Sequence, residues 1–166
     1  MKNRINITLP LTDFEKANLR KNKIKIANIL NYSADELEVL LNSTTERARD
    51  IYALVEFQTI PSIGIKFAED LVFLGYYSLN ELVNKDGAKL TDEYEQKKGY
   101  WIDPCVEDQF RLVVYYAQTK NATKAWWDFT GERKKYRLEN GYPANRPKKA
   151  WHEGLAHKPK ERKGNR

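Results

Sequence analysis

Cysteine, histidine and long apolar stretches are scarce in this sequence, and each shortage excludes a class of protein. Because Cys105 is its one cysteine, the chain of 166 residues cannot form an internal disulfide. Both histidines lie near the C-terminus, far along the chain from Cys105, which argues against a zinc site built from cysteine and histidine. We therefore predict neither a metal site nor a bound cofactor.

Membrane segments are also missing. No apolar stretch approaches the roughly 18 residues that a membrane-spanning helix needs. The first residues, Met1 to Asn6, lack the apolar segment of a secretory signal. A single cysteine fits a reducing compartment. The sequence therefore predicts a cytoplasmic protein that does not contact a membrane.

Strand patterns are absent, whereas helix starts are frequent. The alternation of apolar and polar residues that marks a β-strand never lasts for more than about four residues, so we predict an all-α fold. The Ser/Thr-x-x-Glu capping box, in which two side chains satisfy free N–H groups at a helix start, occurs at Thr12…Glu15, Ser33…Glu36, Ser43…Glu46 and Ser78…Glu81. Asp103-Pro104 predicts a further start. Its apolar residues from Val106 to Ala117 make it the central packing helix.

Positive charge is concentrated at the two ends of the chain. The net charge is +6, but residues 1–25 hold seven basic and two acidic residues, and residues 133–166 hold 12 basic and three acidic ones. Non-specific affinity for nucleic-acid phosphates depends on local Lys and Arg, so we expect the ends to supply most of it. Residues 141–166 contain three prolines and few apolar side chains. We predict a basic, mostly disordered tail there, after a helical domain over 1–140.

A short apolar segment indicates a tight turn between two helices. It reads Ile60-Pro61-Ser62-Ile63-Gly64-Ile65-Lys66 and separates two stretches whose apolar residues follow helical spacing. We expect Gly64 to give the backbone the freedom to turn. N–H groups at the start of the second helix would then face outward, where they can bind a phosphate. The candidate DNA-binding residues are Ser62, Gly64, Ile65 and Lys66; the alternative is a corner that serves only for packing.

An internal repeat predicts a second turn of the same kind. Residues 29–37 resemble residues 73–82, with one more residue in the later copy. Repeats of this type indicate related units that share one core. We therefore expect two units, at about 12–56 and 57–84.

Arg47 and Arg49 lie just after the turn expected in the first unit. There they would project near the mouth of the turn, and they are further candidates for contacts with phosphates. The alternative is that they form ion pairs with Glu46 and Asp50 on a solvated helix face.

Cys105 and three neighbouring carboxylates could carry chemistry, but a structural role is favoured. A cysteine near a helix start can become a reactive or redox-sensing thiolate. The carboxylates of Asp103, Glu107 and Asp108 oppose that charge, so we expect Cys105 to be a small buried residue. Those carboxylates could also form an acid–base pair or a metal site, although helix starts attract carboxylates for structural reasons. We predict no catalytic residue.

The tryptophans have two interpretations. Trp101, Trp126 and Trp127 could stack on nucleic-acid bases, since every base has a π-face. We favour packing over the core, with one of the vicinal pair partly exposed.

Several of these segments together match a known pattern. They run from Ile60 to Leu71, from Leu74 to Leu82, from Asp103 to Arg111, and over Trp126-Trp127. In combination they resemble the bacterial pathogenicity-locus family, also described as mitomycin-resistance-like, over about residues 10–150. The resemblance implies a tandem helix-hairpin-helix fold and a DNA-binding, DNA-repair-associated role without an established reaction. The chain departs from the stronger DNA-binding hairpins at Ser62, where glycine is usual, and in the acidic Glu69 and Asp70.

The leading functional prediction is non-enzymatic, largely sequence-independent DNA binding. Its rival is a protein–protein interaction module in which the acidic middle of the chain and its exposed aromatics meet a protein partner. A third, less favoured, interpretation is a redox or transferase activity based on Cys105.

Overall fold

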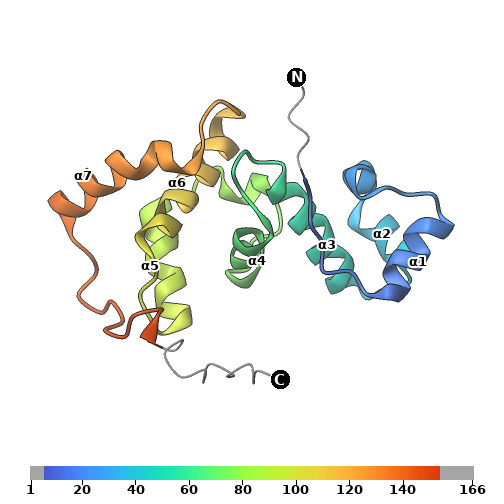
Figure 1. The fold of residues 1–166 in the computed structure, drawn as a ribbon, viewed down its shortest axis with the longest axis horizontal. Helices are drawn as coiled ribbons and strands as arrows, with labels where there is room; N and C mark the ends of the chain where they lie inside the picture. Colours follow the sequence, from blue (N-terminus) through green and yellow to red (C-terminus); the bar gives the residue numbers. More distant parts are fainter. Residues whose placement is uncertain (1–5, 154–166) are drawn as a thin grey trace, which may run out of the picture.

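The protein is helical throughout the part of the chain that the structure describes. A computed structural model describes residues 6–153 and contains no strand there beyond one isolated bridge (Figure 1). The α-helices are α1 (Asp13–Lys21), α2 (Ala34–Leu41), α3 (Thr45–Gln58), α4 (Ile65–Phe73), α5 (Gly87–Lys98), α6 (Pro104–Thr119) and α7 (Thr130–Asn140). The 3₁₀ helices are η1 (Ile26–Asn31), η2 (Leu79–Leu82) and η3 (Trp126–Phe129). The predicted all-α class is confirmed, and every described helix is too short or too polar to cross a bilayer.

Helix α3 lies between two hydrophobic clusters and contributes to both. Its Ile51 and Val55 pack into an N-terminal cluster with α1, η1 and α2. Its Leu54 and Phe57 pack into a larger cluster with α4, α5 and α6. Figure 1 shows α3 between α1 and α2 on one side and the helices from α4 onward on the other. The described residues thus have two hydrophobic clusters joined by α3, whereas the repeat led us to expect units that share one core.

Helix α6 forms the centre of the larger cluster, as its sequence predicted. The Asp103 side chain accepts a hydrogen bond from the Cys105 N–H (2.9 Å), and Pro104 occupies the first turn. Phe110, Leu112 and Val113 are fully buried, and α5, α7, η2 and η3 all pack against α6. The start of this helix and its central position are both confirmed.

The capping boxes are confirmed to different degrees. Ser33 and Glu36 form the complete box at the start of α2. At the next helix Thr44, and not Ser43, is the cap, accepting from the Arg47 N–H. Ser78 precedes the 3₁₀ helix η2, but its side chain makes no capping hydrogen bond; Glu81 instead accepts from the Tyr77 N–H.

The two copies of the internal repeat adopt different structures. The first runs from a 3₁₀ helix into α2, whereas the second runs from α4 into a 3₁₀ helix.

The segment 141–153, which we call the strap, lies against α5 and is not disordered as predicted. The backbone N–H of Trp101 donates to the Lys149 carbonyl (2.9 Å), and the backbone N–H of Trp151 donates to the Trp101 carbonyl (2.8 Å). Ala150, between these bonds, is buried. The composition of the strap suggested disorder because it contains few apolar residues, but backbone hydrogen bonds and the ion pair of Arg146 with Glu95 hold it. Residues 154–166 of the predicted tail lie outside the described residues.

Buried ion pairs join α7 and the strap to α5 and α6. Arg133 binds Asp108 (Nε–Oδ1, 2.6 Å), Arg137 binds Glu107 (Nε–Oε2, 2.9 Å) and Arg146 binds Glu95 (Nε–Oε1, 3.0 Å). The three carboxylate side chains are at most 2% exposed. These three arginines, counted in the sequence as positive charge near the C-terminus, are therefore neutralised inside the fold.

At Gly87 the start of α5 packs tightly against Arg111 of α6, which gives a test of this packing. A Cβ at position 87 would lie 2.8 Å from the Arg111 Cα and 2.9 Å from its backbone N. Because backbone cannot move aside cheaply, we expect Gly87→Ala to lower the free energy of unfolding by about 1–3 kcal/mol, measured by urea denaturation. Gly131→Ala in α7 is the control: its Cβ would meet nothing within 4 Å, so stability should be unchanged or slightly raised. Equal behaviour of the two variants would contradict this packing.

Candidate nucleic-acid interface

The turn between α3 and α4 is anchored by two buried isoleucines. Ile60 and Ile63 are 2% and 6% exposed, and the Ile63 N–H donates to the Ile60 carbonyl (3.2 Å). The chain must reverse between them, and Ser62 adopts the left-handed conformation that this reversal requires (φ 63°). Gly64 has φ −99°, which any residue can adopt. The prediction that Gly64 supplies the conformational freedom of the turn is therefore wrong. Ser62 is the residue that adopts the left-handed conformation.

The N-terminus of α4 is open to solvent. The first N–H groups of a helix have no partner within the helix. Gly64 occupies the cap position and has no side chain to satisfy them. Ser62, Gly64 and Lys66 are exposed, and Ile65 is half-buried. The site therefore offers free N–H groups and the positive end of a helix dipole beside one ammonium group, an arrangement that suits an anion.

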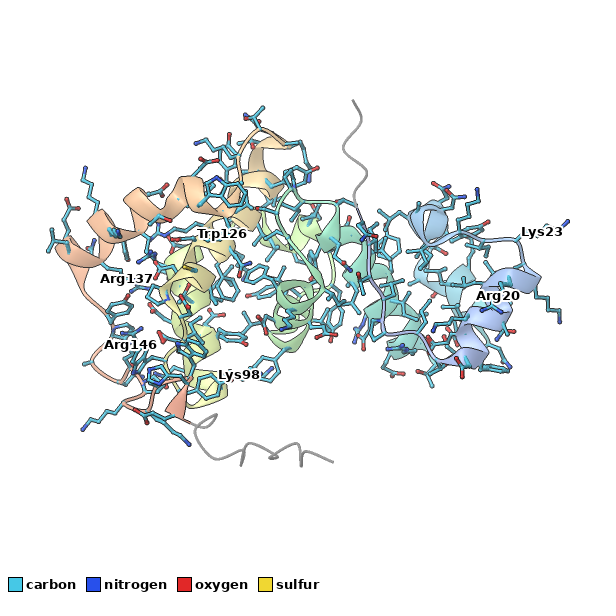
Figure 2. The ribbon with its side chains drawn as sticks, in the orientation of Figure 1. Arg20, Lys23, Lys98, Trp126, Arg137 and Arg146 are labelled. Carbon is cyan, nitrogen blue, oxygen red and sulfur yellow. The ribbon has the colours of Figure 1, made fainter. Side chains whose placement is uncertain are left out.

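The tryptophan pair lies beside this turn. Trp126 donates its backbone N–H to the Ser62 Oγ (3.0 Å), a bond between residues 64 positions apart. Trp126 is half-buried, whereas Trp127 is 58% exposed, with its ring centroid 5.4 Å from that of Trp126. Figure 2 shows Trp126 above α6, where η3 meets the α3–α4 turn. The residue that contacts Ser62 is thus followed directly by a tryptophan whose ring is largely exposed.

One of the two acids near the turn is engaged within the fold. Of the two acids after Lys66, Asp70 accepts a hydrogen bond from the Tyr94 hydroxyl (2.7 Å) and is partly buried. Burial raises the pKa of Asp70, although the Tyr94 bond opposes the shift. Lys124, exposed in the loop before Trp126, lies over the Tyr115 ring (4.7 Å from Nζ to the centroid). Lys124 also lines a hollow with Arg111 and Glu132. Sequence reasoning missed the contact of Trp126 with Ser62, because no local pattern shows that the loop before η3 folds onto a turn some 60 residues earlier.

Comparison with known proteins adds one finding. A family model described as pathogenicity locus (Cdd1) matches residues 50–135. The chain belongs to the pathogenicity locus family. The matched segment runs from within α3 to within α7, so it includes the α3–α4 turn and both tryptophans. No curated protein and no solved structure matches the chain.

The two predicted arginines lie just before the segment that matches the pathogenicity locus family. Both are near the start of α3, whereas the α3–α4 turn follows its end, about 15 Å further along the helix axis. Arg47 binds Glu15 (Nε–Oε1, 3.0 Å) and donates to the Pro10 carbonyl (2.7 Å), and Arg49 lies over the Tyr77 ring (3.8 Å). The structure therefore does not gather them with Lys66 into one positive rim, nor pair them with Glu46 or Asp50.

Cys105 of this pathogenicity locus protein is exposed, and not buried as predicted. Partial desolvation at the helix start, with the hydrogen bond and negative charge of Asp103, raises the pKa of the Cys105 thiol. The carboxylates of Glu107 and Asp108 form ion pairs with arginine side chains. Among residues 6–153, no group of His, Cys, Asp and Glu side chains has the arrangement of a metal site.

The raised pKa of the Cys105 thiol predicts how its alkylation rate depends on pH. Because its pKa is raised, the alkylation rate of native Cys105 should keep rising with pH beyond the ordinary thiol pKa of about 8.5. Asp103→Asn removes a charge that raises the pKa, so the rate at pH 7.5 should increase severalfold, while asparagine still caps the helix. The rate is measured with iodoacetamide and mass spectrometry.

The matched control is Asp86→Asn, the same change at the cap of α5, which should leave the rate unchanged. A rate that is already maximal below pH 7 would show a stabilised thiolate and would favour a reactive cysteine.

Proposed function

We propose that this protein is a non-enzymatic, largely sequence-independent DNA-binding protein. The observation that supports this best is the open N-terminus of α4, exposed beside Lys66 and the ring of Trp127. Within this proposal, the regions at about 12–56 and 57–84 are tandem helix-hairpin-helix units of the mitomycin-resistance-like type. The biological role is association with DNA repair.

The chemistry of the turn favours contacts with the DNA backbone. A phosphate oxygen would accept hydrogen bonds from the N–H groups of Ile65 and Lys66, and the Lys66 ammonium would neutralise its charge. Backbone contacts position a protein on DNA without reading bases, which accounts for the proposed lack of sequence preference. Trp127 would extend the contact beyond the helix end.

The distribution of free charge supports the same proposal. Arg133, Arg137 and Arg146 are used in ion pairs, whereas Lys66, Lys124 and the lysines of α7 and the strap remain exposed. Exposed lysines supply the salt-dependent part of DNA affinity. The raised pKa of Cys105 and the pairing of Glu107 and Asp108 agree with a binding role in place of a catalytic one.

Lys66→Glu tests the site. We expect about a tenfold weaker affinity for a short DNA duplex at low salt, because one charge-assisted contact is lost and a repulsion is added. Fluorescence anisotropy of a labelled duplex measures the affinity. Lys21→Glu at the end of α1 makes the same change of charge on the other hydrophobic cluster, and its effect should be clearly smaller. Equal losses in both variants, or none in Lys66→Glu, would remove the turn from the interface.

One observation favours the second candidate function, binding of a protein partner. An apolar groove on α2 is lined by Tyr32, Val39 and Leu40 and edged by Asp35 and Glu36. Val39 is 79% exposed, and a large exposed apolar side chain in a groove is typical of an interaction site. The acidic edge suits a basic peptide with apolar anchor residues.

Substitutions at Val39 distinguish binding of a protein partner from binding of DNA. Under this second proposal, a photo-crosslinking amino acid at position 39 should join the protein to one partner in cells. Val39→Glu should then abolish the complex with that partner, because it places a charge among the apolar side chains of the groove. The same substitution should leave the affinity for duplex DNA unchanged. Loss of DNA affinity with Val39→Glu would instead place the groove in the nucleic-acid interface.

A further inference from the structure

The end of the molecule that carries the strap has a surface of lysines and aromatic rings that reach solvent. We call it the strap surface and define it as Lys97, Lys98, Lys148, Lys149, Trp151 and His152. Figure 2 shows Lys98 and Arg146 at this end of α5, away from Trp126. The strap surface is therefore separate from the α3–α4 turn.

The positive charge of the strap surface is only partly used within the fold: Lys97 donates a hydrogen bond to the Phe73 carbonyl, and the charge of Lys98 acts on Asp70. Arg146 is the basic residue of the strap that binds a buried carboxylate, Glu95. Among the ion pairs of residues 6–153, none includes Lys97, Lys98, Lys148 or Lys149. Across residues 97–101 and 141–153 Glu153 is the single acid, against five basic residues. The surface is thus positive and available to an anionic partner.

Aromatic rings are interleaved with these lysines. Trp151 is 37% exposed, and the His152 ring lies between Trp151 and Trp101 at 5.5 Å and 5.9 Å from their centroids. On the α5 side, Lys97 and Lys98 lie over the ring of Phe73, which is also exposed. Rings left exposed beside cations offer stacking faces that the core does not use.

The backbone holds this arrangement in place. The two hydrogen bonds between Trp101 and the strap fix Lys149 and Trp151 on either side of buried Ala150. The ion pair of Arg146 with Glu95 anchors the strap from the other side. Cations and an aromatic ring at fixed positions suit a repeating ligand better than a single small anion.

From this arrangement we propose that the strap surface binds single-stranded nucleic acid, with a base stacked on Trp151 and phosphates on Lys148 and Lys149. Stacking needs an unpaired base with a free face, whereas a duplex exposes only its edges and backbone. The inference rests on the proposed nucleic-acid function and adds a second contact, selective for single strands, to the duplex contact at the α3–α4 turn.

The experiment uses the full chain with three labelled probes: oligothymidylate, oligouridylate and a duplex of equal length. Trp151→Ala should weaken oligothymidylate binding at least about fivefold and leave duplex binding nearly unchanged. Trp151→Phe, which keeps a ring, should restore most of the affinity. Lys148→Ala with Lys149→Ala should reduce the slope of log affinity against log salt for the single strand by about 1.4. Oligouridylate shows whether RNA is bound as well as DNA.

The matched control is Lys134→Ala with Lys135→Ala, two adjacent exposed lysines on α7, which should change the slope less. Unchanged single-strand affinity in both Trp151→Ala and the Lys148/Lys149 variant would overturn the inference, even if Lys66→Glu weakens duplex binding. If Lys66→Glu has no effect while Trp151→Ala weakens single-strand binding, the α3–α4 turn proposal fails and the strap inference stands. Equal losses for the duplex and the single strand in the Trp151 variant would also overturn it, since selectivity for unpaired bases would be absent.

Discussion

Three buried carboxylates determine how the C-terminal third of this protein folds. Glu95 of α5 and Glu107 and Asp108 of α6 are buried where α7 and the strap pack, and an ionised carboxylate there is costly unless it is paired. Removing one partner of a buried ion pair commonly costs about 3–5 kcal/mol. Arg133, Arg137 and Arg146 provide the partners, and the bidentate shape of a guanidinium suits a carboxylate better than an ammonium does. The positions of α7 and the strap therefore follow from the need to neutralise these acids.

This pairing also decides which charges remain for partners. Arginines of α7 and the strap point inward, while lysines of the same segments stay in water. A sequence count of basic residues cannot separate these two groups. The separation places free positive charge at two surfaces, one beside the open end of α4 and one on the strap, and both have an exposed tryptophan. The proposed nucleic-acid function depends on those surfaces and not on the total charge.

Local signals in the sequence predicted local structure well. Asp103-Pro104 marked the start of α6 correctly, and the Ser33 box marked α2, because a cap depends on residues within one turn of the helix. Predictions that depended on distant contacts were less successful. Ser62 takes the left-handed conformation expected at Gly64, since burial of Ile60 and Ile63 fixes where the chain reverses. Cys105 is exposed because its position places it on the outer side of α6.

The sequence by itself determined the all-α class, the positions of most helices, the central place of α6 and the family, since these follow from residue spacing and short motifs. Only the tertiary structure decided which charges are free, that α3 serves two clusters, and that the strap is ordered. It also decided that Trp126 meets Ser62 and that Arg47 is held by Glu15. These outcomes depend on groups far apart in the chain, whose pairing is set by the cost of burying an unpartnered charge or polar group.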